Sequence, residues 1–557
     1  MKRNLYIWVV TACMTVLVQA CESYLDKQPL SGPSDVSYFT SQNDLVIAVN
    51  GCYKIINFAP LDNIPMNLVL DNGTDIGWDR NNSALQALGL GNQDSNNGFS
   101  QSVWKNAYSA IARCNFILDN MDKVKDKMDE SLFKRCRAEV RFIRAYVYQY
   151  MIDFFGGVPL VTHVLQLSEA QIPRNSKEEI LSFVFSELDE AAADLPLTYS
   201  GNDIGRATRG AALAIKARAA LNNEKWDIAA AASKAVMDLN LYSLHTNFGE
   251  LFSYKGESSK EIIFASQFLK GTVVHSTPFN LLSRNGQGAS NKVPSQSLVD
   301  AYECIDGLTI DKSPLFDPAH PYQNRDPRLG FTVALPGSVF YNYQFETHKD
   351  SVKCWNYNVT PATRITNQEA TNAYASFTGY CWKKYVDLQD KDDRQNSELN
   401  VIQIRYAEVL LIYAEAMIEA GKIDESVYTA INAVRQRPSV NMPPITAGKT
   451  QAEMRSVVRR ERLYELAMEG FRLTDIRRWK IADKAMNGPF YGRIPRGLLS
   501  NAPVIDENGI PDYSGVANRD QMRVVEVRTF HSNRDYLWPI PNIETVTDPK
   551  IEQNPNY

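Results

Sequence analysis

The hydrophobic positions of this chain of 557 residues repeat with helical spacing over several long segments. In SLFKRCRAEVRFIRAYVYQYMIDFF, Phe142, Tyr146 and Tyr150 are four residues apart and other apolar residues adjoin them, which predicts a helix with one broad apolar face. Two glycines and Pro159 then predict its end. Further helices are expected in QNDLVIAVNGCYKIIN, SVWKNAYSAIARCNFILDNM and SKEEILSFVFSELDEAAADL.

Several of the expected helices come in pairs joined by short turns. The first pair is ATRGAALAIKARAALNN with KWDIAAAASKAVMDLN, and alanine at most packing positions allows close approach of the two helices. Later pairs are IQIRYAEVLLIYAEAMIEAGK with ESVYTAINAVRQR, and TQAEMRSVVRRERLYELAMEG with FRLTDIRRWKIADKAM. Tetratricopeptide repeats are helix pairs of about 34 residues. The pairs favour degenerate repeats of this kind, and an α-helical domain packed through alanine is the alternative.

Between these helices lies a stretch of different composition. Residues 241–400 hold many Gly, Pro, Asn and aromatic residues and little helical periodicity, and residues 486–545 are similar. We therefore predict a mainly α-helical fold that carries a loop-rich irregular part with short strands. The expected regions are an N-terminal leader (1–20), a tether (21–40), an N-terminal helical region (41–240), the loop-rich region (241–400), C-terminal helix pairs (401–485) and a closing irregular segment (486–557).

The N-terminus, MKRNLYIWVVTACMTVLVQAC, has the form of an export signal. Lys2 and Arg3 precede an apolar stretch that is shorter than the roughly 20 residues of a membrane-spanning helix. The last four letters, VQAC, resemble a lipobox, so Cys21 is the expected lipidation site and the anchor to the membrane. A buried N-terminal helix is the alternative.

Composition narrows the function classes. The hydrophobic fraction of 44% and the charged fraction of 22% are typical of globular proteins. The formal net charge is −5, and it becomes −7 when Lys2 and Arg3 leave with the signal, so nucleic-acid binding is disfavoured. Six cysteines outside the signal are scattered without metal-binding spacing. Cys354 and Cys381 flank an aromatic region and are a possible disulfide, although a chain of this size needs none.

Enzyme motifs are mostly absent from the sequence. It contains no HExxH, no GxSxG, no complete phosphate loop and no dinucleotide fingerprint, and no cofactor or metal is expected. The acidic segment 387–398 lacks the glycine of a calcium loop. Paired carboxylates of a glycosidase have no fixed spacing in sequence, so the pattern carries no specific signal for or against them. In RRERLYELAMEGFRLTDIRRWK, charges three residues apart suit ion pairs on a helix surface: Arg462 with Glu465, Glu469 with Arg472, and Asp475 with Arg478.

Two loops combine aromatic and polar residues in the way that sugar binding requires. An aromatic ring packs on the C–H face of a sugar, while Asn, Asp and Arg form hydrogen bonds with its hydroxyl groups. DNGTDIGWDRNN and CWNYNVT have this mixture. For any single aromatic residue, burial in the core is the more common role. The ligand-binding candidates in these loops and in comparable settings are Trp78, Asp79, Arg80, Asn81, Phe99, Arg284, Asn285, Tyr341, Trp355 and Tyr357.

Taken together, several segments resemble the SusD/RagB family of surface nutrient-binding lipoproteins. They are, in order, CESYLDKQP, RAEVRFIRAYVYQYMIDFFGGVPLV, SLVDAYECIDG with NRDPRLGFTV, IQIRYAEVLLIYAEAMIEAGK, INAVRQR, RRERLYELAMEGFRLTDIRRWK and YLWPIPNIETVTDPKIEQNPNY. The resemblance spans nearly the whole chain after Cys21. It implies four tetratricopeptide-like helix pairs, a lipid anchor in the outer membrane, and a SusC-like TonB-dependent transporter as partner. These motifs belong to the scaffold, so the resemblance assigns no binding residue.

Three functions follow as hypotheses. The family resemblance favours capture of an oligosaccharide for delivery to the transporter, without catalysis. Capture of a peptide, as in some relatives of this family, is the second hypothesis, and it predicts polar groups directed at a peptide backbone. A glycoside hydrolase is the third, and it predicts two carboxylates about 5–10 Å apart across one cleft.

Overall fold

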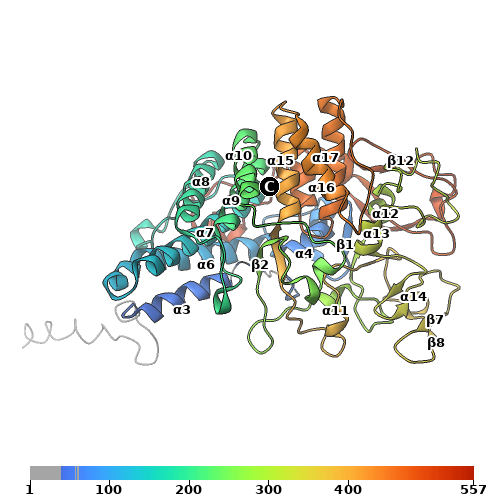
Figure 1. Ribbon diagram of the computed structural model, residues 1–557, viewed down its shortest axis with the longest axis horizontal. Coiled ribbons are helices and arrows are strands. Elements are labelled where there is room, and N and C mark those ends of the chain that lie inside the picture. Colours follow the sequence, from blue (N-terminus) through green and yellow to red (C-terminus); the bar gives the residue numbers. More distant parts are fainter. Residues whose placement is uncertain (1–38, 55, 57, 59–61) are drawn as a thin grey trace, which may run out of the picture.

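The computed structural model describes residues 39–54, 56, 58 and 62–557. Long helices form its left and upper part in Figure 1. They are α3 (Gln42–Tyr53), α6 (Gly98–Asn120), α7 (Glu130–Phe155), α8 (Lys177–Asp194), α9 (Arg209–Asn222), α10 (Trp226–Asp238), α15 (Tyr406–Glu419), α16 (Glu425–Arg435), α17 (Gln451–Leu466) and α18 (Arg472–Arg478). The leader, Cys21 and nearly all of the tether lie outside the described residues. No helix of the described part is long and apolar enough to cross a membrane.

Consecutive helices pack against one another as the sequence predicted. Helix α7 contacts α6 and α8, α9 contacts α10, and α15 contacts both α16 and α17. Helix α10 also packs on α15, so the early and late helices form one continuous array although the loop-rich region separates them in sequence (Figure 1). The prediction of a mainly α-helical fold with helix pairs is confirmed.

Capping and small side chains explain where these helices begin and how closely they pack. Asp129 accepts hydrogen bonds from the first backbone N–H groups of α7, and Ser176 and Thr450 form capping boxes at α8 and α17. On α9, alanines that include Ala214 and Ala217 are fully buried. Because alanine adds little bulk, the backbones of neighbouring helices approach closely there.

Short strands, which were predicted, and short helices, which were not, lie in the loop-rich region and in irregular segments outside it. The strand pairs are β1 (Gly77–Asp79) with β3 (Lys292–Pro294), β2 (Ile262–Ser266) with β10 (Val401–Arg405), β4 (Val333–Ala334) with β9 (Cys381–Trp382), β11 (Gly488–Gly492) with β14 (Arg523–Arg528), and β12 (Val504–Ile505) with β13 (Pro511–Asp512). One sheet has four strands: β5 (Val339–Phe340), β6 (Tyr343–Gln344), β7 (Lys353–Asn356) and β8 (Thr363–Thr366). The short helices are α4 (Asn67–Leu70), α5 (Ser83–Leu90), α11 (Thr277–Leu281), α12 (Gln296–Ala301), α13 (Pro327–Thr332), α14 (Gln368–Thr371), α19 (Ala482–Ala485) and α20 (Asn542–Thr547).

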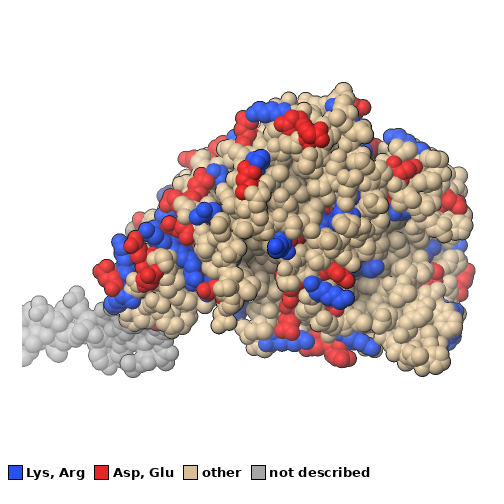
Figure 2. All heavy atoms as spheres, in the orientation of Figure 1, with Lys and Arg blue, Asp and Glu red and all other residues tan. Residues whose placement is uncertain are grey.

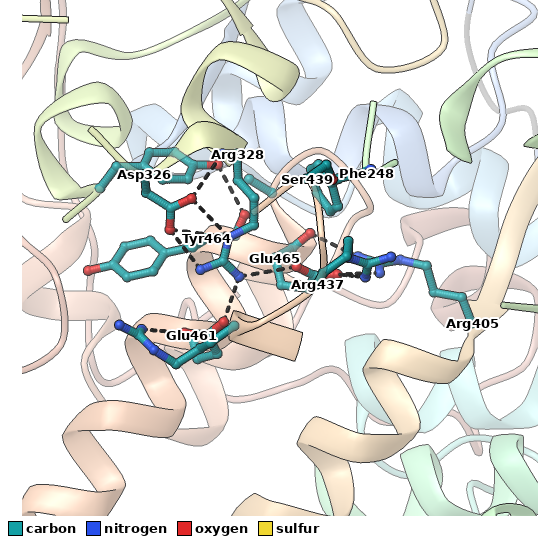
Figure 3. Close-up of polar contacts among 12 residues, drawn as sticks. Phe248, Asp326, Arg328, Arg405, Arg437, Ser439, Glu461, Tyr464 and Glu465 are labelled. Atoms are coloured by element: carbon teal, nitrogen blue, oxygen red, sulfur yellow. Dashed lines mark hydrogen bonds and ion pairs between the residues drawn. The ribbon is translucent and has the colours of Figure 1, made fainter. Parts of the chain in front are cut away.

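A buried network of arginines and carboxylates joins the loop-rich region to the C-terminal helices (Figure 3). Glu465 on α17 accepts hydrogen bonds from Arg405 and Arg437, at 2.7 Å each, and lies 3.1 Å from Arg328. Arg328 also pairs with Asp326 and with the neighbouring helix residue Glu461, and the side chains of these residues are at most 1% exposed. The network ties four distant segments together.

The helix-surface pairs predicted for this charged run are therefore only partly correct. Asp475 and Arg478 do pair, at 2.8 Å. Arg462 instead pairs with Asp475, and Arg472 reaches Asp75 in the loop before β1. The residues are buried rather than on the surface, because tertiary partners from other segments neutralise each charge.

The described cysteines are all free thiols. Cys354 and Cys381 are both fully buried and do not form the disulfide that the sequence left open. Burial raises the pKa of the Cys381 thiol well above its ordinary value. The hydrophobic core and the buried ion pairs thus hold this region together without a covalent link.

Candidate functional site

Strand β1 carries the first predicted loop, but its tryptophan points inward. Trp78 is 6% exposed and its Nε1–H donates to Glu526 on β14 at 2.7 Å. Its ring lies 5.3 Å from that of Phe377. The neighbouring Asp79 is also buried, where Lys292 on β3 forms an ion pair with it at 3.0 Å. Trp78 and Asp79 therefore belong to the packed interior and do not present their side chains to a ligand.

Arg80 and Arg284, which both belong to the predicted set, meet at one backbone carbonyl. Arg80 Nη1 donates to the carbonyl oxygen of Tyr374 at 2.6 Å, and Arg284 Nε donates to the same oxygen at 2.9 Å. A second donor of Arg80, Nη2, reaches the carbonyl of Ala289 at 2.9 Å. The exposed Asn81 follows Arg80, and its backbone N–H is held by Asp79. Three segments remote in sequence thus converge.

Tyr374 presents the most exposed aromatic ring of this area. It is 63% exposed, and the guanidinium carbon of Arg80 lies 5.5 Å from its ring centre. Arg80 and Arg523 lie at 5.4 Å and 4.3 Å from the ring centre of the half-buried Phe377. We call the set Arg80, Arg284, Lys349, Tyr374, Phe377 and Arg523 the Tyr374 surface.

A groove adjoins the Tyr374 surface. It has a volume of about 1040 Å³, and its lining includes Tyr322, Glu346, His348 and Arg493. His348 directly precedes Lys349, and the carbonyl of Arg493 accepts a hydrogen bond from the backbone N–H of Arg523. The groove and the Tyr374 surface are therefore linked through Lys349 and Arg523.

Three other predicted residues do not face this surface. Phe99 is fully buried on α6, with its ring edge against Trp538, so it is a core residue and the prediction that it binds ligand is wrong. Tyr341 is 8% exposed, and burial raises its pKa to about 12. Asn285 is buried; its amide donates to Asn367 and accepts from the backbone N–H of Gln368, so it fixes the start of α14 beside the site.

Trp355 and Tyr357 form a separate aromatic surface on the four-stranded sheet. Trp355 on β7 is 38% exposed, and Arg364 on β8 lies 5.2 Å from its ring centre. Tyr357 is 43% exposed. No hydrogen bond, ion pair or ring contact between described residues joins them directly to Arg80 or Arg284. β8 runs on through Asn367 into α14, which leads to Tyr374.

The carboxylates around the Tyr374 surface are already occupied by protein groups. Glu369 is 1% exposed and accepts backbone N–H groups of Arg284 and Ser376. Glu526 accepts from Trp78 and pairs with Arg528 at 2.7 Å. Burial raises the pKa of Asp79 and of Glu369. In the described part of the chain, no three His, Cys, Asp or Glu side chains form a possible metal site.

Sequence reasoning missed Tyr374, Phe377, Lys349 and Arg523. The segment TNAYASFTG mixes Asn, Ser, Tyr and Phe, as the two chosen loops do, and that mixture could have identified Tyr374 and Phe377. Arg523 lies in an alternating strand with no local signal. Its place beside Phe377 depends on tertiary packing.

Comparisons with known proteins place the chain in a family. The SusD family model matches residues 260–557, and a second model, described as starch-binding associating with outer membrane, matches residues 23–221. The chain belongs to the SusD family. Glycan binding is the role described for this family, and the family is described as associated with the outer membrane.

Individual SusD proteins show the same relationship over most of the chain. A SusD-like carbohydrate-binding protein of Bacteroides fragilis superposes with a TM-score of 0.78 at 30% identity, covering 92% of this chain and all of that one. A SusD-like protein of Formosa agariphila, P25, is 26% identical over 510 residues, which is 86% of this chain and 89% of that protein. The starch-binding protein SusD of Bacteroides thetaiotaomicron is 35% identical over 152 residues, about a quarter of each chain.

Proposed function

We propose that this protein captures an oligosaccharide at the cell surface, with the Tyr374 surface as its binding site, and passes it to a SusC-like TonB-dependent transporter. The observation that carries the proposal is the exposed ring of Tyr374, whose backbone carbonyl oxygen accepts hydrogen bonds from arginines of two other segments. A sugar ring packs on the aromatic face while the guanidinium groups and Asn81 form hydrogen bonds at its edge. The B. fragilis relative, named as carbohydrate-binding, supports the ligand class.

The anchoring part of the proposal comes from the N-terminus. The signal-like segment and Cys21 precede the described residues, and a lipid on Cys21 would hold the processed protein at the outer membrane without a spanning helix. The helix array is a large protein surface separate from the aromatic loops (Figure 1). A binding site on the loops leaves that array available to contact a transporter.

Two features argue against catalysis and against peptide capture. Asp79 and Glu369 are buried, Glu526 is half-buried, and all three are hydrogen-bonded or ion-paired within the protein, so these carboxylates are not placed as a general acid and base. An exposed aromatic ring flanked by guanidinium groups suits a sugar better than an extended peptide backbone, which needs matched backbone donors and acceptors.

The test is titration calorimetry of the processed protein, produced without residues 1–21, against oligosaccharides and peptide digests. Saturable binding to a glycan class without product release supports the proposal. Tyr374→Ala is expected to weaken that binding by about 1–3 kcal/mol, the loss of one aromatic contact. Trp355→Ala is the comparison, because it removes an exposed ring from the other surface. Binding to peptides alone, or unchanged affinity in Tyr374→Ala, would contradict the assignment.

A further inference from the structure

The cations of the Tyr374 surface lack carboxylate partners. Arg80 and Arg284 are held by backbone carbonyls, and Lys349 Nζ likewise donates to the carbonyls of Glu369 and Ala370 at 3.2 and 3.3 Å. The guanidinium of Arg523 lies 4.3 Å from the ring centre of Phe377. Among the described residues, none of the four side chains has an ion pair within 4 Å.

The arginines of the buried network, in contrast, have carboxylate partners. Arg328, Arg405 and Arg437 are buried and each pairs with at least two carboxylates (Figure 3). On the face shown in Figure 2, Lys and Arg are interspersed with Asp and Glu and no large surface has one sign. Arginines without an ion pair to any described residue also lie on rings elsewhere, as Arg364 does on Trp355 and Arg477 on Trp538, but the Tyr374 surface groups four such cations in a chain whose net charge is −5.

The charge excess remains when buried neighbours are included. Asp79 and Asp62 share Lys292, at 3.0 and 2.8 Å, and Glu369 is the buried carboxylate nearest Arg284 and Lys349. Six cations therefore face four carboxylates: Arg80, Arg284, Lys292, Lys349, Arg523 and Arg528 against Asp62, Asp79, Glu369 and Glu526. Burial and the neighbouring Arg284 lower the pKa of Arg80, while Asp79 and Glu369 act in the opposite direction.

Several side-chain N–H groups of Arg284 and Arg523 have no hydrogen-bond acceptor among the described residues. Arg284 uses only Nε within the protein, and Arg523 donates no side-chain hydrogen bond to any described residue. Both residues are half-buried, and none of their side-chain nitrogens is among the fully buried, unpartnered atoms of the described residues. A guanidinium with two open donors matches a carboxylate or a sulfate through paired hydrogen bonds.

We infer that the ligand is an anionic oligosaccharide, with uronate carboxylates or sulfate esters that the four unpaired cations bind while a sugar ring packs on Tyr374. The inference rests on the proposed function and names its substrate class. A neutral glycan would leave the mutual repulsion of the cations in place, whereas an anionic glycan removes it. Binding is therefore expected to weaken as salt screens these contacts.

The experiment uses calorimetry with glycans of known charge. The carboxylate probe is an oligogalacturonide, and the sulfate probe is chondroitin sulfate compared with its desulfated form. The neutral probes are laminarin, amylopectin and xylan, and a single-stranded DNA of similar charge controls for unspecific anion binding. Arg284→Gln and Arg523→Gln each remove one unpaired cation. Arg137→Gln on α7, which pairs with Asp194 and lies 40% exposed, removes the same charge from the helical part as the control.

We expect one anionic glycan to bind, with a loss of about tenfold in affinity for Arg284→Gln or Arg523→Gln, none for Arg137→Gln, and weaker binding at high salt. Circular dichroism shows that each variant is folded. A neutral glycan that binds with no loss in either variant would overturn the anionic class and leave glycan capture standing. Equal affinity for the DNA would also overturn it. Binding of no glycan at all would overturn the proposed function itself.

Discussion

Replacement of Glu465 by glutamine tests the buried network on which the fold depends. Glu465 contacts Arg328, Arg405 and Arg437, and its side chain is fully buried. Despite the cost of burial, these three arginines hold the pKa of Glu465 well below its ordinary value. Glutamine keeps the size but removes the charge, so three buried arginines lose a shared counter-ion.

The expected loss of stability follows from the burial of Glu465 among three arginines. Loss of one partner in a buried ion network costs about 3–5 kcal/mol. An unfolding entropy of about 2.1 cal/mol/K per residue over about 520 residues gives roughly 1.1 kcal/mol/K, so Tm is expected to fall by about 3–5 °C. Thermal unfolding followed by circular dichroism, with a urea midpoint as a second readout, measures the change.

The pH dependence of the Tm difference between Glu465→Gln and wild type checks that the lost charge of Glu465 is the cause. A carboxyl whose pKa is lowered by folding contributes stability above its unfolded pKa of about 4.3, and that contribution is lost as pH falls toward the folded pKa. Glutamine does not titrate, so the Tm difference from wild type is expected to shrink below about pH 4.

The matched control is Glu130→Gln, in an exposed pair with Lys134 at 2.8 Å, and its Tm is expected to stay close to wild type. Equal Tm values for Glu465→Gln and wild type at pH 7 would refute the argument that this network stabilises the fold.

Three further predictions concern other buried features. Burial raises the pKa of Asp300 to about 6, so its ionisation destabilises the fold as pH rises from about 4 to 6, and the Tm penalty of Asp300→Asn is expected to be smaller at pH 8 than at pH 5; a larger penalty at pH 8 would contradict this. Gly470→Ala is expected to lower stability by at least about 1–3 kcal/mol, because φ is +87° and a Cβ there would lie 2.5 Å from the carbonyl oxygen of Asn67; an unchanged urea midpoint would argue against it. Alkylation of the denatured, unreduced processed chain is expected to label six cysteines by mass spectrometry; four labels would reveal a disulfide.

The fold could be predicted largely from the sequence because its signals are local. Helix α7 follows from the four-residue spacing of Phe142, Tyr146 and Tyr150, and the pair α9 and α10 from its buried alanines. The irregular region followed from composition alone. The partners of its short strands did not, because pairs such as β1 with β3 join segments more than 200 residues apart.

The site could be predicted only in part. Arg80 and Arg284 were chosen for residue type, and the structure brings them together at the carbonyl of Tyr374. Trp78 and Phe99 were chosen on the same grounds but are buried, because composition does not tell which face of a strand or helix a ring occupies. The charge of Glu465 suggested a surface pair, whereas its partners come from three other segments.

The measurement that tests the central claim most directly is a crystal structure of the processed protein with the oligosaccharide that binds most tightly in the calorimetric panel. The account predicts a sugar ring stacked on Tyr374, with Arg80 or Arg284 in hydrogen-bond contact and an acidic group of the glycan at the open N–H donors of Arg284 or Arg523. Density for the sugar against Trp355 and Tyr357 alone, with the Tyr374 surface empty, would contradict it.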